Sequence, residues 1–251
     1  MQHSTRSTIL FAAVVCLACS VFVAGSAVAL RSFQQQNATL DKQKNVLAVA
    51  GLVEPGQRLS AKDVEDRFRE SIRPRLVDLK TGAYATDEEK TLDTYDPEKT
   101  PSEPAPPNKA RVMQLPEYTL VYQVVKDDKV ERVILPVHGK GLWSTLYGLL
   151  AMDADGKTIR GITFYEHAET PGLGGEVDNP KWKAKWDGRQ AVDEKGTAVI
   201  CVVKGTADQP YEVDGLSGAT LTSRGVTNLV QFWLGENGFG PYLATIRNKR
   251  E

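Results

Sequence analysis

The sequence predicts an α+β fold, in which a single N-terminal transmembrane helix precedes a domain with an antiparallel sheet and packed helices. Residues 9–30 are almost wholly apolar, β-rich runs come in pairs separated by short polar turns, and a helical stripe follows near the C-terminus. A chain of 251 residues is long enough for one sizeable domain plus additional segments. We expect a short cytoplasmic N-terminus (1–8), a transmembrane helix (9–30), a helical segment with a proline-rich acidic excursion (31–110) and the globular domain (111–251).

The apolar run near the N-terminus is long enough to cross a bilayer. As a helix, residues 9–30 would span roughly 33 Å at about 1.5 Å per residue. A cleaved signal peptide is the alternative, because Ala27-Val28-Ala29 resembles a cleavage site, but the apolar core of a signal is usually only about 7–15 residues long. We therefore favour a retained anchor. Since the hydrophilic mass follows the span, the simplest orientation places the domain outside the cytoplasmic membrane.

Between the span and the domain, the sequence indicates two helices and then irregular chain. Apolar residues up to Ala50 continue the first helix until Gly51, and Ser60 can open a second helix that ends near Pro74. Residues 83–110 are acidic and rich in proline. Such a composition cannot build a core, so we expect a surface excursion or linker.

The C-terminal part of the sequence supplies the sheet and the packed helices. Two hairpins are expected, with turns at 126–129 and 153–157, and a further strand at 198–203. Asn179 followed by Pro180 can start a short helix whose two tryptophans would lie in the core. The last stripe consists of Val226, Leu229, Val230 and Trp233, and Gly235 can end this helix.

Composition excludes several classes of function. The net charge of −1 gives no electrostatic footprint for nucleic acid, so none is expected as a partner. Only Cys201 lies outside the apolar N-terminus, which excludes an internal disulfide or a four-thiolate iron–sulfur cluster in the polar part. The three histidines show no metal-ligand spacing, so no metal site is expected. Any redox chemistry therefore requires an organic cofactor.

One stretch between the predicted strand and the last helix is rich in small residues and hydroxyls. Gly218 and Ala219 would let a bulky group approach the backbone. The hydroxyls of Ser217, Thr220, Thr222 and Ser223, together with the free N–H groups of a helix start, suit an anion such as a phosphate. A hydroxyl helix cap beside a glycine turn is the alternative, and it is favoured for a generic sequence of this kind.

The complete string is more specific than its parts. Asp-x-x-Ser-Gly-Ala-Thr, followed by x-Thr-Ser, starts at Asp214 and resembles the flavinylation motif of the FMN-binding domain family. The resemblance implies that Thr220 carries FMN through a phosphoester bond, which a separate flavin transferase makes from FAD. It also places the motif residues at the cofactor: Asp214, Ser217, Gly218, Ala219, Thr222 and Ser223.

Two glycine-rich loops, at 139–145 and 167–175, are expected to face the same ligand. Trp143 and Leu173 are candidates for the flat apolar cover that a flavin ring needs, and simple packing is an equal alternative for Trp143. Glu169, Thr170 and backbone groups could hydrogen-bond to the polar side of the ring, with Ser144 and Gly174 as further contacts. For His167 we favour an exposed or hydrogen-bonded imidazole over a role in proton transfer.

Four segments in order resemble the C subunit of the sodium-translocating NADH:quinone reductases. They are residues 141–144, 167–175, 214–223 and 238–242, and they follow a membrane span. The resemblance implies a non-autonomous enzyme subunit in the bacterial inner membrane that relays electrons from NADH toward quinone in a sodium-pumping complex. Its partners would be the other subunits, the flavin transferase and the lipid bilayer.

Three other functions are alternatives. The G subunit of the Rnf-type ferredoxin:NAD oxidoreductases has the same motif, but it is typically shorter before its flavin domain. A membrane-tethered scaffold would use Thr220 only as a helix cap. A stand-alone flavin reductase ranks last, because we find neither an acid–base set nor a Gly-x-Gly-x-x-Gly nicotinamide fingerprint.

Overall fold

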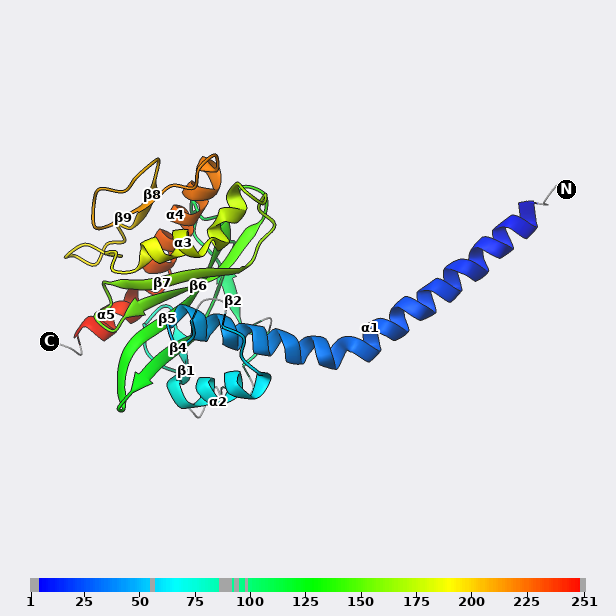
Figure 1. The fold of residues 1–251 in the computed structure, drawn as a ribbon, viewed down its shortest axis with the longest axis horizontal. Helices are drawn as coiled ribbons and strands as arrows, with labels where there is room; N and C mark the ends of the chain where they lie inside the picture. Colours follow the sequence, from blue (N-terminus) through cyan, green and yellow to red (C-terminus); the bar gives the residue numbers. More distant parts are fainter. Residues whose placement is uncertain (1–4, 55–56, 86–91, 93–94, 98, 249–251) are drawn as a thin grey trace. The chain divides into compact units, whose positions relative to one another are not determined.

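The computed structural model describes residues 5–54, 57–85, 92, 95–97 and 99–248, and the chain divides into two compact units, 1–43 and 44–251. In the first unit, the described residues belong to one helix, α1 (Thr5–Val49), whose last residues enter the second unit (Figure 1). Its apolar stretch has a mean hydropathy of 2.5 and no buried side chains. Within the described chain, α1 is the one helix long and apolar enough to cross a membrane.

A five-stranded antiparallel sheet forms the centre of the second unit. Its order is β1 (Ile72–Asp78), β4 (Tyr118–Lys126), β5 (Lys129–Lys140), β6 (Thr145–Asp153) and β7 (Ile159–Glu166). The register pairs Tyr122 with Ile134 and Leu135 with Leu150. Both predicted hairpins are confirmed, and so is the antiparallel sheet. Strand β5 runs on to Lys140, so the first glycine-rich loop is shorter than expected and begins at Gly141.

Strand β1 was not expected. Helix α2 (Ala61–Ser71) starts at Ser60 as predicted, through a capping box in which Ser60 and Asp63 bond each other's backbone N–H groups. The helix ends at Ser71 and the chain enters β1 directly, so Pro74 lies inside a strand instead of ending a helix. Because β1 is the edge strand of this sheet, next to β4, the missing N–H of Pro74 is tolerated there.

The proline-rich excursion contributes more to the fold than its composition indicates. Strands β2 (Ser102–Pro104) and β3 (Gln114–Pro116) pair with each other, although the segment was expected to be irregular. Ala110 is fully buried, and its carbonyl accepts the Lys140 N–H at 2.8 Å. The expectation that this stretch adds nothing to the core is therefore wrong at its C-terminal end. Residues 86–91, 93–94 and 98 of the stretch lie outside the described residues.

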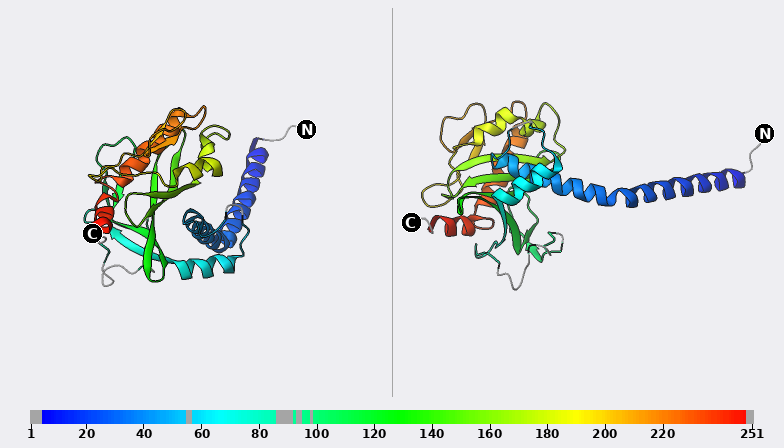
Figure 2. Two further views of the ribbon diagram at one scale, coloured as in Figure 1. Left: turned by 60° about the vertical axis from the view of Figure 1, so that its left-hand side comes forward. Right: turned by 60° about the horizontal axis from the view of Figure 1, so that its bottom comes forward.

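Five further helices and a third, two-stranded sheet complete the domain within the described residues. They are η2 (Gly174–Asp178), α3 (Pro180–Lys183), η3 (Ala184–Trp186), β8 (Cys201–Val203), β9 (Glu212–Asp214), α4 (Thr220–Leu234) and α5 (Gly240–Asn248). The strand expected at 198–203 is reduced to its last three residues, which pair in parallel with β9. Helix α4 packs against β5 and β8, and Figure 2 shows α4 and α5 along one side of the large sheet.

The core lies between α4 and the sheet. Val226, Leu229, Val230 and Trp233 are all buried, as the helical stripe predicts, and α4 ends before Gly235. The Trp233 indole N–H donates to the His138 carbonyl at 2.7 Å, which satisfies the one polar atom of this side chain. Trp182 and Trp186 are buried too and meet edge to face, as expected for a core pair. This packing fixes α4 relative to the sheet.

Candidate functional site

The motif of small residues and hydroxyls connects β9 to α4. Asp214 is the last residue of β9 and Thr220 is the first residue of α4. Ala219 occupies the N-cap position, and no side chain caps the helix. Thr220 is therefore not the cap that the scaffold alternative requires. Gly218 has a φ of 72°, a conformation that favours glycine, and this turn directs the chain into the helix.

The four hydroxyls of the motif fall into two classes. Thr222 and Ser223 are buried, and each holds the site together: Thr222 donates to Glu169 at 2.7 Å, and Ser223 accepts the Leu216 N–H at 3.1 Å. Ser217 and Thr220 are exposed, and within the described part of the chain neither hydroxyl has a hydrogen-bond partner. The structure thus leaves two hydroxyls of the motif available for reaction.

Glu169 joins the two glycine-rich loops to α4. Its side chain is only 5% exposed, and its carboxylate accepts the N–H groups of Trp143 and Ser144 at 2.9 and 3.2 Å as well as the Thr222 hydroxyl. Burial alone would raise the pKa of this carboxyl, but the hydrogen bonds from Thr222, Trp143 and Ser144 outweigh burial and lower the pKa below its ordinary value. Glu169 is therefore a buried anion at neutral pH.

Two glycines allow the close approach of these segments. A side chain on Gly225 of α4 would lie 2.6 Å from the Lys140 carbonyl oxygen, at the end of β5. A side chain on Gly174 would lie 2.6 Å from both the Glu169 carboxylate and the Thr222 hydroxyl. Both distances are shorter than any normal contact, so the loops can pack on α4 only because these positions are glycine.

An apolar patch lies beside the motif, on the side where Glu169 joins the two glycine-rich loops to α4. It consists of Leu142, Trp143, Leu173 and Leu221, which are 39%, 67%, 45% and 52% exposed. Leu173 lies against the motif, since a Cβ on Gly218 would be 2.9 Å from its side chain. Trp143 is too exposed for the simple packing role that was its alternative. The two loops therefore present apolar side chains to solvent near Thr220, where a ligand or a protein can cover them.

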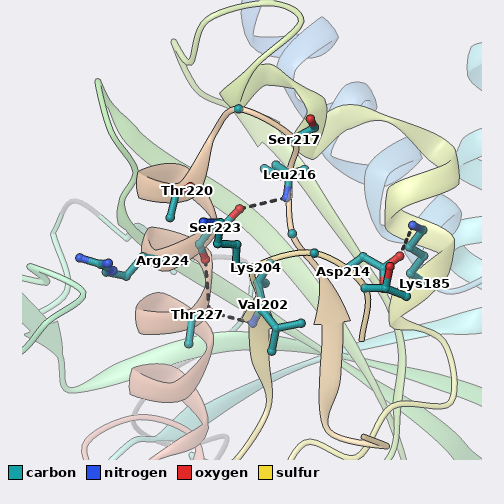
Figure 3. Close-up of a pocket in the computed structure, with 15 residues that line it drawn as sticks. Lys185, Val202, Lys204, Asp214, Leu216, Ser217, Thr220, Ser223, Arg224 and Thr227 are labelled. Atoms are coloured by element: carbon teal, nitrogen blue, oxygen red, sulfur yellow. Dashed lines mark hydrogen bonds and ion pairs between the residues drawn. The ribbon is translucent and has the colours of Figure 1, made fainter. Parts of the chain in front are cut away.

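A pocket of about 700 Å³ opens at the motif and is lined by residues around β8, β9 and the start of α4 (Figure 3). Thr220 is part of its lining, and so are three cationic side chains, Lys185, Lys204 and Arg224. Lys185 forms an ion pair with Asp214. In the described chain, Lys204 and Arg224 have no ion-pair partner, and Arg224 follows Thr220 by one helical turn. The pocket thus has excess positive charge.

Asp214 holds the loop of this pocket. Its carboxylate accepts the Ala207 N–H at 2.7 Å and pairs with Lys185, and both contacts lower the pKa of the Asp214 carboxyl below its ordinary value. Its carbonyl accepts the Trp182 indole N–H at 2.8 Å. Thr227 adds a second link, because its hydroxyl accepts the Val202 N–H at 2.9 Å and donates to the Ser223 carbonyl at 3.2 Å. These contacts fix β8 and β9 against α4.

The predicted site residues therefore lie around the N-terminal end of α4, in one group on the pocket side and one on the patch side. Asp214, Ser217, Gly218, Thr220 and Ser223 line the pocket. Trp143, Ser144, Glu169, Leu173, Gly174 and Thr222 belong to the other side, where the hydrogen bonds and close contacts of Glu169 and Leu173 connect them. Ala219 is buried at the N-cap, and Thr170 stabilises its own loop by accepting the Leu173 and Gly175 N–H groups.

Sequence reasoning missed the cations of the pocket. The position of Arg224, four residues after Thr220 in a predicted helix, was a usable signal. Lys185 comes from η3 and Lys204 from the loop after β8, and the approach of both to the motif depends on the fold. The expectation for His167 agrees with the structure: its Nε2 lies 2.8 Å from the Asp178 carboxylate, and its Nδ1 accepts the Glu169 N–H at 3.2 Å. The imidazole therefore stabilises the second loop by connecting it to Asp178 of η2.

Comparison with known proteins agrees with the geometry. Residues 141–235 match the model of the FMN-binding domain. This range of the chain includes both glycine-rich loops, the motif and α4. The chain is 49% identical to the C subunit of the Na(+)-translocating NADH-quinone reductase of Pseudomonas aeruginosa, over 98% of this chain and 97% of the relative. It is 46% identical to the corresponding protein of Yersinia pestis, over 98% and 94%.

Solved structures show the same fold. The crystal structure of NqrC from Shewanella oneidensis superposes with a TM-score of 0.72 at 34% identity, covering 84% of this chain and 99% of that one. The corresponding protein from Parabacteroides distasonis gives 0.65 at 28% identity, covering 86% and 96%. Both the family model and the near full-length relatives lead to one assignment. The chain belongs to the family of C subunits of the Na(+)-translocating NADH-quinone reductases.

Proposed function

We propose that Thr220 carries FMN through a phosphoester bond and that the loaded domain relays electrons within the complex. Membership of the C-subunit family makes the chain a flavoprotein subunit of an oxidoreductase complex in the inner membrane. The observation that supports Thr220 as the attachment point is its exposed hydroxyl, which has no hydrogen-bond partner among the described residues, at a position that lines the pocket next to the apolar patch. Thr222, the other threonine of the motif, is buried and bonded to Glu169, so it is not available.

The two sides of Thr220 match the two chemical halves of FMN. The phosphate needs positive charge and N–H donors, which Lys204, Arg224 and the first turn of α4 can supply. The ring needs flat apolar cover, which Trp143 and Leu173 can supply. We therefore propose that the phosphoester lies on the pocket side and the ring on the patch side. Ser144, Thr170 and Gly174 would offer polar contacts from the two loops.

The loading reaction is a displacement at phosphorus. The Thr220 oxygen would form a bond to the flavin-side phosphorus of FAD, the bond from that phosphorus to the bridging oxygen would break, and AMP would leave with that oxygen. The hydroxyl proton would pass to a base of the flavin transferase or to water. Because Thr220 is exposed at a helix start, a second protein can reach it without unfolding the domain.

FMN, when bound, supplies reversible uptake and release of electrons. The residues of this chain would hold the ring at the surface, on the exposed side chains of Trp143 and Leu173, where a neighbouring subunit can approach it. Electrons from NADH would then pass through this domain toward quinone. We place residues 1–8 in the cytoplasm, 9–30 in the lipid bilayer and the domain on the periplasmic side, with 31–110 leading from the anchor to the FMN-binding part at 111–251.

Mass spectrometry of the full chain, co-expressed with a flavin transferase, tests the attachment. Trypsin should release residues 205–224 as one peptide, since Lys204 and Arg224 flank it, and we expect an FMN-sized addition that fragmentation assigns to Thr220. Thr220→Ala should abolish the addition. Ser217→Ala is the matched control, because Ser217 is the other exposed hydroxyl of the motif and lies on the same peptide, and it should retain the addition. An unmodified wild-type peptide, with a transferase active on another substrate, would contradict the proposal.

A further inference from the structure

Glu169 is a buried negative charge without a positive partner among the described residues. Its side chain is 5% exposed, and its three hydrogen-bond donors, the Trp143 and Ser144 N–H groups and the Thr222 hydroxyl, are all neutral. Within the described residues, no lysine, arginine or histidine forms an ion pair with it. An uncompensated carboxylate in the interior is unfavourable unless hydrogen bonds stabilise it, so its presence calls for an explanation.

The position of this charge is tied to the apolar patch. One carboxylate oxygen accepts both backbone N–H groups of the loop that carries Trp143, and the other meets Thr222, two residues after Thr220. The backbone of Gly174, next to Leu173, lies so close that a Cβ would be 2.6 Å from the carboxylate. The anion therefore lies beneath the loops that carry Trp143 and Leu173.

We propose that Glu169 tunes the redox potential of the FMN: its fixed negative charge beneath the ring opposes reduction and so lowers the midpoint potential. This proposal rests on the proposed function, which places the ring on the patch side of Thr220. Each electron that a reductant adds to the ring brings negative charge there, partly neutralised by any proton taken up. A carboxylate shielded from water repels that charge more strongly than one at the surface.

The hydrogen bonds keep Glu169 charged where it is. Without them, burial would favour the protonated acid and the electrostatic effect would vanish. Together they hold the pKa of the carboxyl below its ordinary value, so the charge persists at neutral pH. The same three bonds also give Glu169 a structural role, and an experiment has to separate the two roles.

Glu169→Gln removes the charge and can retain the contacts. The amide oxygen can accept the two N–H groups, and the NH₂ group can donate to the Thr222 hydroxyl, which then turns from donor to acceptor. Glu166→Gln is the matched control: it makes the same chemical change at an exposed position, three residues earlier, where water screens the charge. Thr222→Val is the structural control, since it removes one of the bonds and leaves the carboxylate in place.

The measurement is spectroelectrochemical titration of the full-length, FMN-loaded chain in detergent, after intact mass has verified the loading. We expect Glu169→Gln to shift the midpoint potential to less negative values, by several times the shift of Glu166→Gln. Thr222→Val should lower thermal stability without reproducing that shift.

Three results would overturn the proposal. A loaded Glu169→Gln chain with the potential of the Glu166→Gln control would show that the buried charge does not act on the ring. An equal shift in Thr222→Val would assign the effect to structure instead of charge. A Glu169→Gln chain that stays unloaded, beside a loaded wild type, would assign Glu169 to cofactor attachment. Failure of the wild type itself to acquire FMN would refute the proposed function, and is recognised by mass alone.

Discussion

The two sides of the first turn of α4 differ in how they handle charge. On one side, the Glu169 anion is buried and hydrogen-bonded beneath exposed apolar side chains. On the other, the cations Lys204 and Arg224 line an open pocket, and within the described residues they have no ion-pair partner. A ligand with an apolar ring and an anionic phosphate is therefore favoured in one orientation only. The asymmetry of the site, more than any single residue, supports FMN as its ligand.

The two sides are also held together differently. Beneath the patch, a single carboxylate receives bonds from a loop and from α4, so much of the structure depends on one side chain. Around the pocket, each segment has its own hydrogen bond to α4. Ser223 accepts the Leu216 N–H, and Thr227 accepts the Val202 N–H. We expect substitutions on the patch side to have the larger effect on stability.

Glu169→Ala should destabilise the fold more than Ser223→Ala does on the pocket side. It leaves the Trp143 and Ser144 N–H groups and the Thr222 hydroxyl without their acceptor, and an unsatisfied buried donor costs about 1–3 kcal/mol. We expect a loss of about 3 kcal/mol or more in the free energy of unfolding, measured by chemical denaturation with near-UV circular dichroism. Glu166→Ala, at an exposed position, should change it by less than about 0.5 kcal/mol. Equal effects would refute the role of Glu169 as the link between the segments.

Ser223→Ala tests the pocket side. The buried Leu216 N–H loses its acceptor, which predicts a loss of about 1–3 kcal/mol, smaller than that for Glu169→Ala. The same denaturation measurement applies. Ser217→Ala removes an exposed hydroxyl from the same motif and should be nearly neutral. A destabilised Ser217→Ala chain, beside an unaffected Ser223→Ala chain, would reverse the assignment of structural and available hydroxyls.

Much of this asymmetry could not be predicted from the sequence. Local patterns predicted both hairpins, the Ser60 cap and helix α4, because hydrophobic period and turn residues are local properties. Strand β1 was missed because Pro74 ends helices in most settings, and only its edge position in the sheet makes it acceptable. Ala110 was missed because the average composition of its segment is polar, whereas burial is decided residue by residue.

Prediction of the site from the sequence is limited in the same way. The motif and both glycine-rich loops were predicted to meet at one site, and Thr220 was selected as the candidate attachment point by its place in the motif. Glu169 could be selected as a candidate, but its three donors come from residues 25, 26 and 53 positions away in the chain. Lys185 reaches the pocket from η3 and Lys204 from the loop after β8, and no local pattern marks either as a pocket residue. Long-range contacts of this kind depend on the fold and carry little signal in one sequence.

Acidic pH should weaken the patch side through protonation of Glu169. Since hydrogen bonds lower the pKa of Glu169 in the folded state, below an ordinary value of 4.5, the ionised side chain stabilises the fold above that value. This contribution is lost as pH falls through the lowered folded-state pKa. The difference in unfolding free energy between wild type and Glu169→Gln should therefore be constant near neutral pH and change only below about pH 5. Denaturation at a series of pH values measures it, and a difference that changes between about pH 6 and 8 would contradict the assigned charge state.

The smallest effect is expected for the cations of the pocket. Lys204→Gln and Arg224→Gln each remove an exposed positive charge near Thr220, and such charges are worth about 0.2–1 kcal/mol, which corresponds to no more than about a fivefold change in rate. We expect each substitution to slow the transfer of FMN onto the unloaded chain within that limit, in an assay of initial rates with a flavin transferase. Lys195→Gln, another exposed lysine outside the pocket, is the control and should leave the rate unchanged. The deficit should shrink as salt is added, because ions screen exposed charges over about 10 Å at about 0.1 M. A deficit that persists unchanged at high salt would mean that these side chains act through shape, and the division of the site into a cationic and an apolar side would then lose its electrostatic basis.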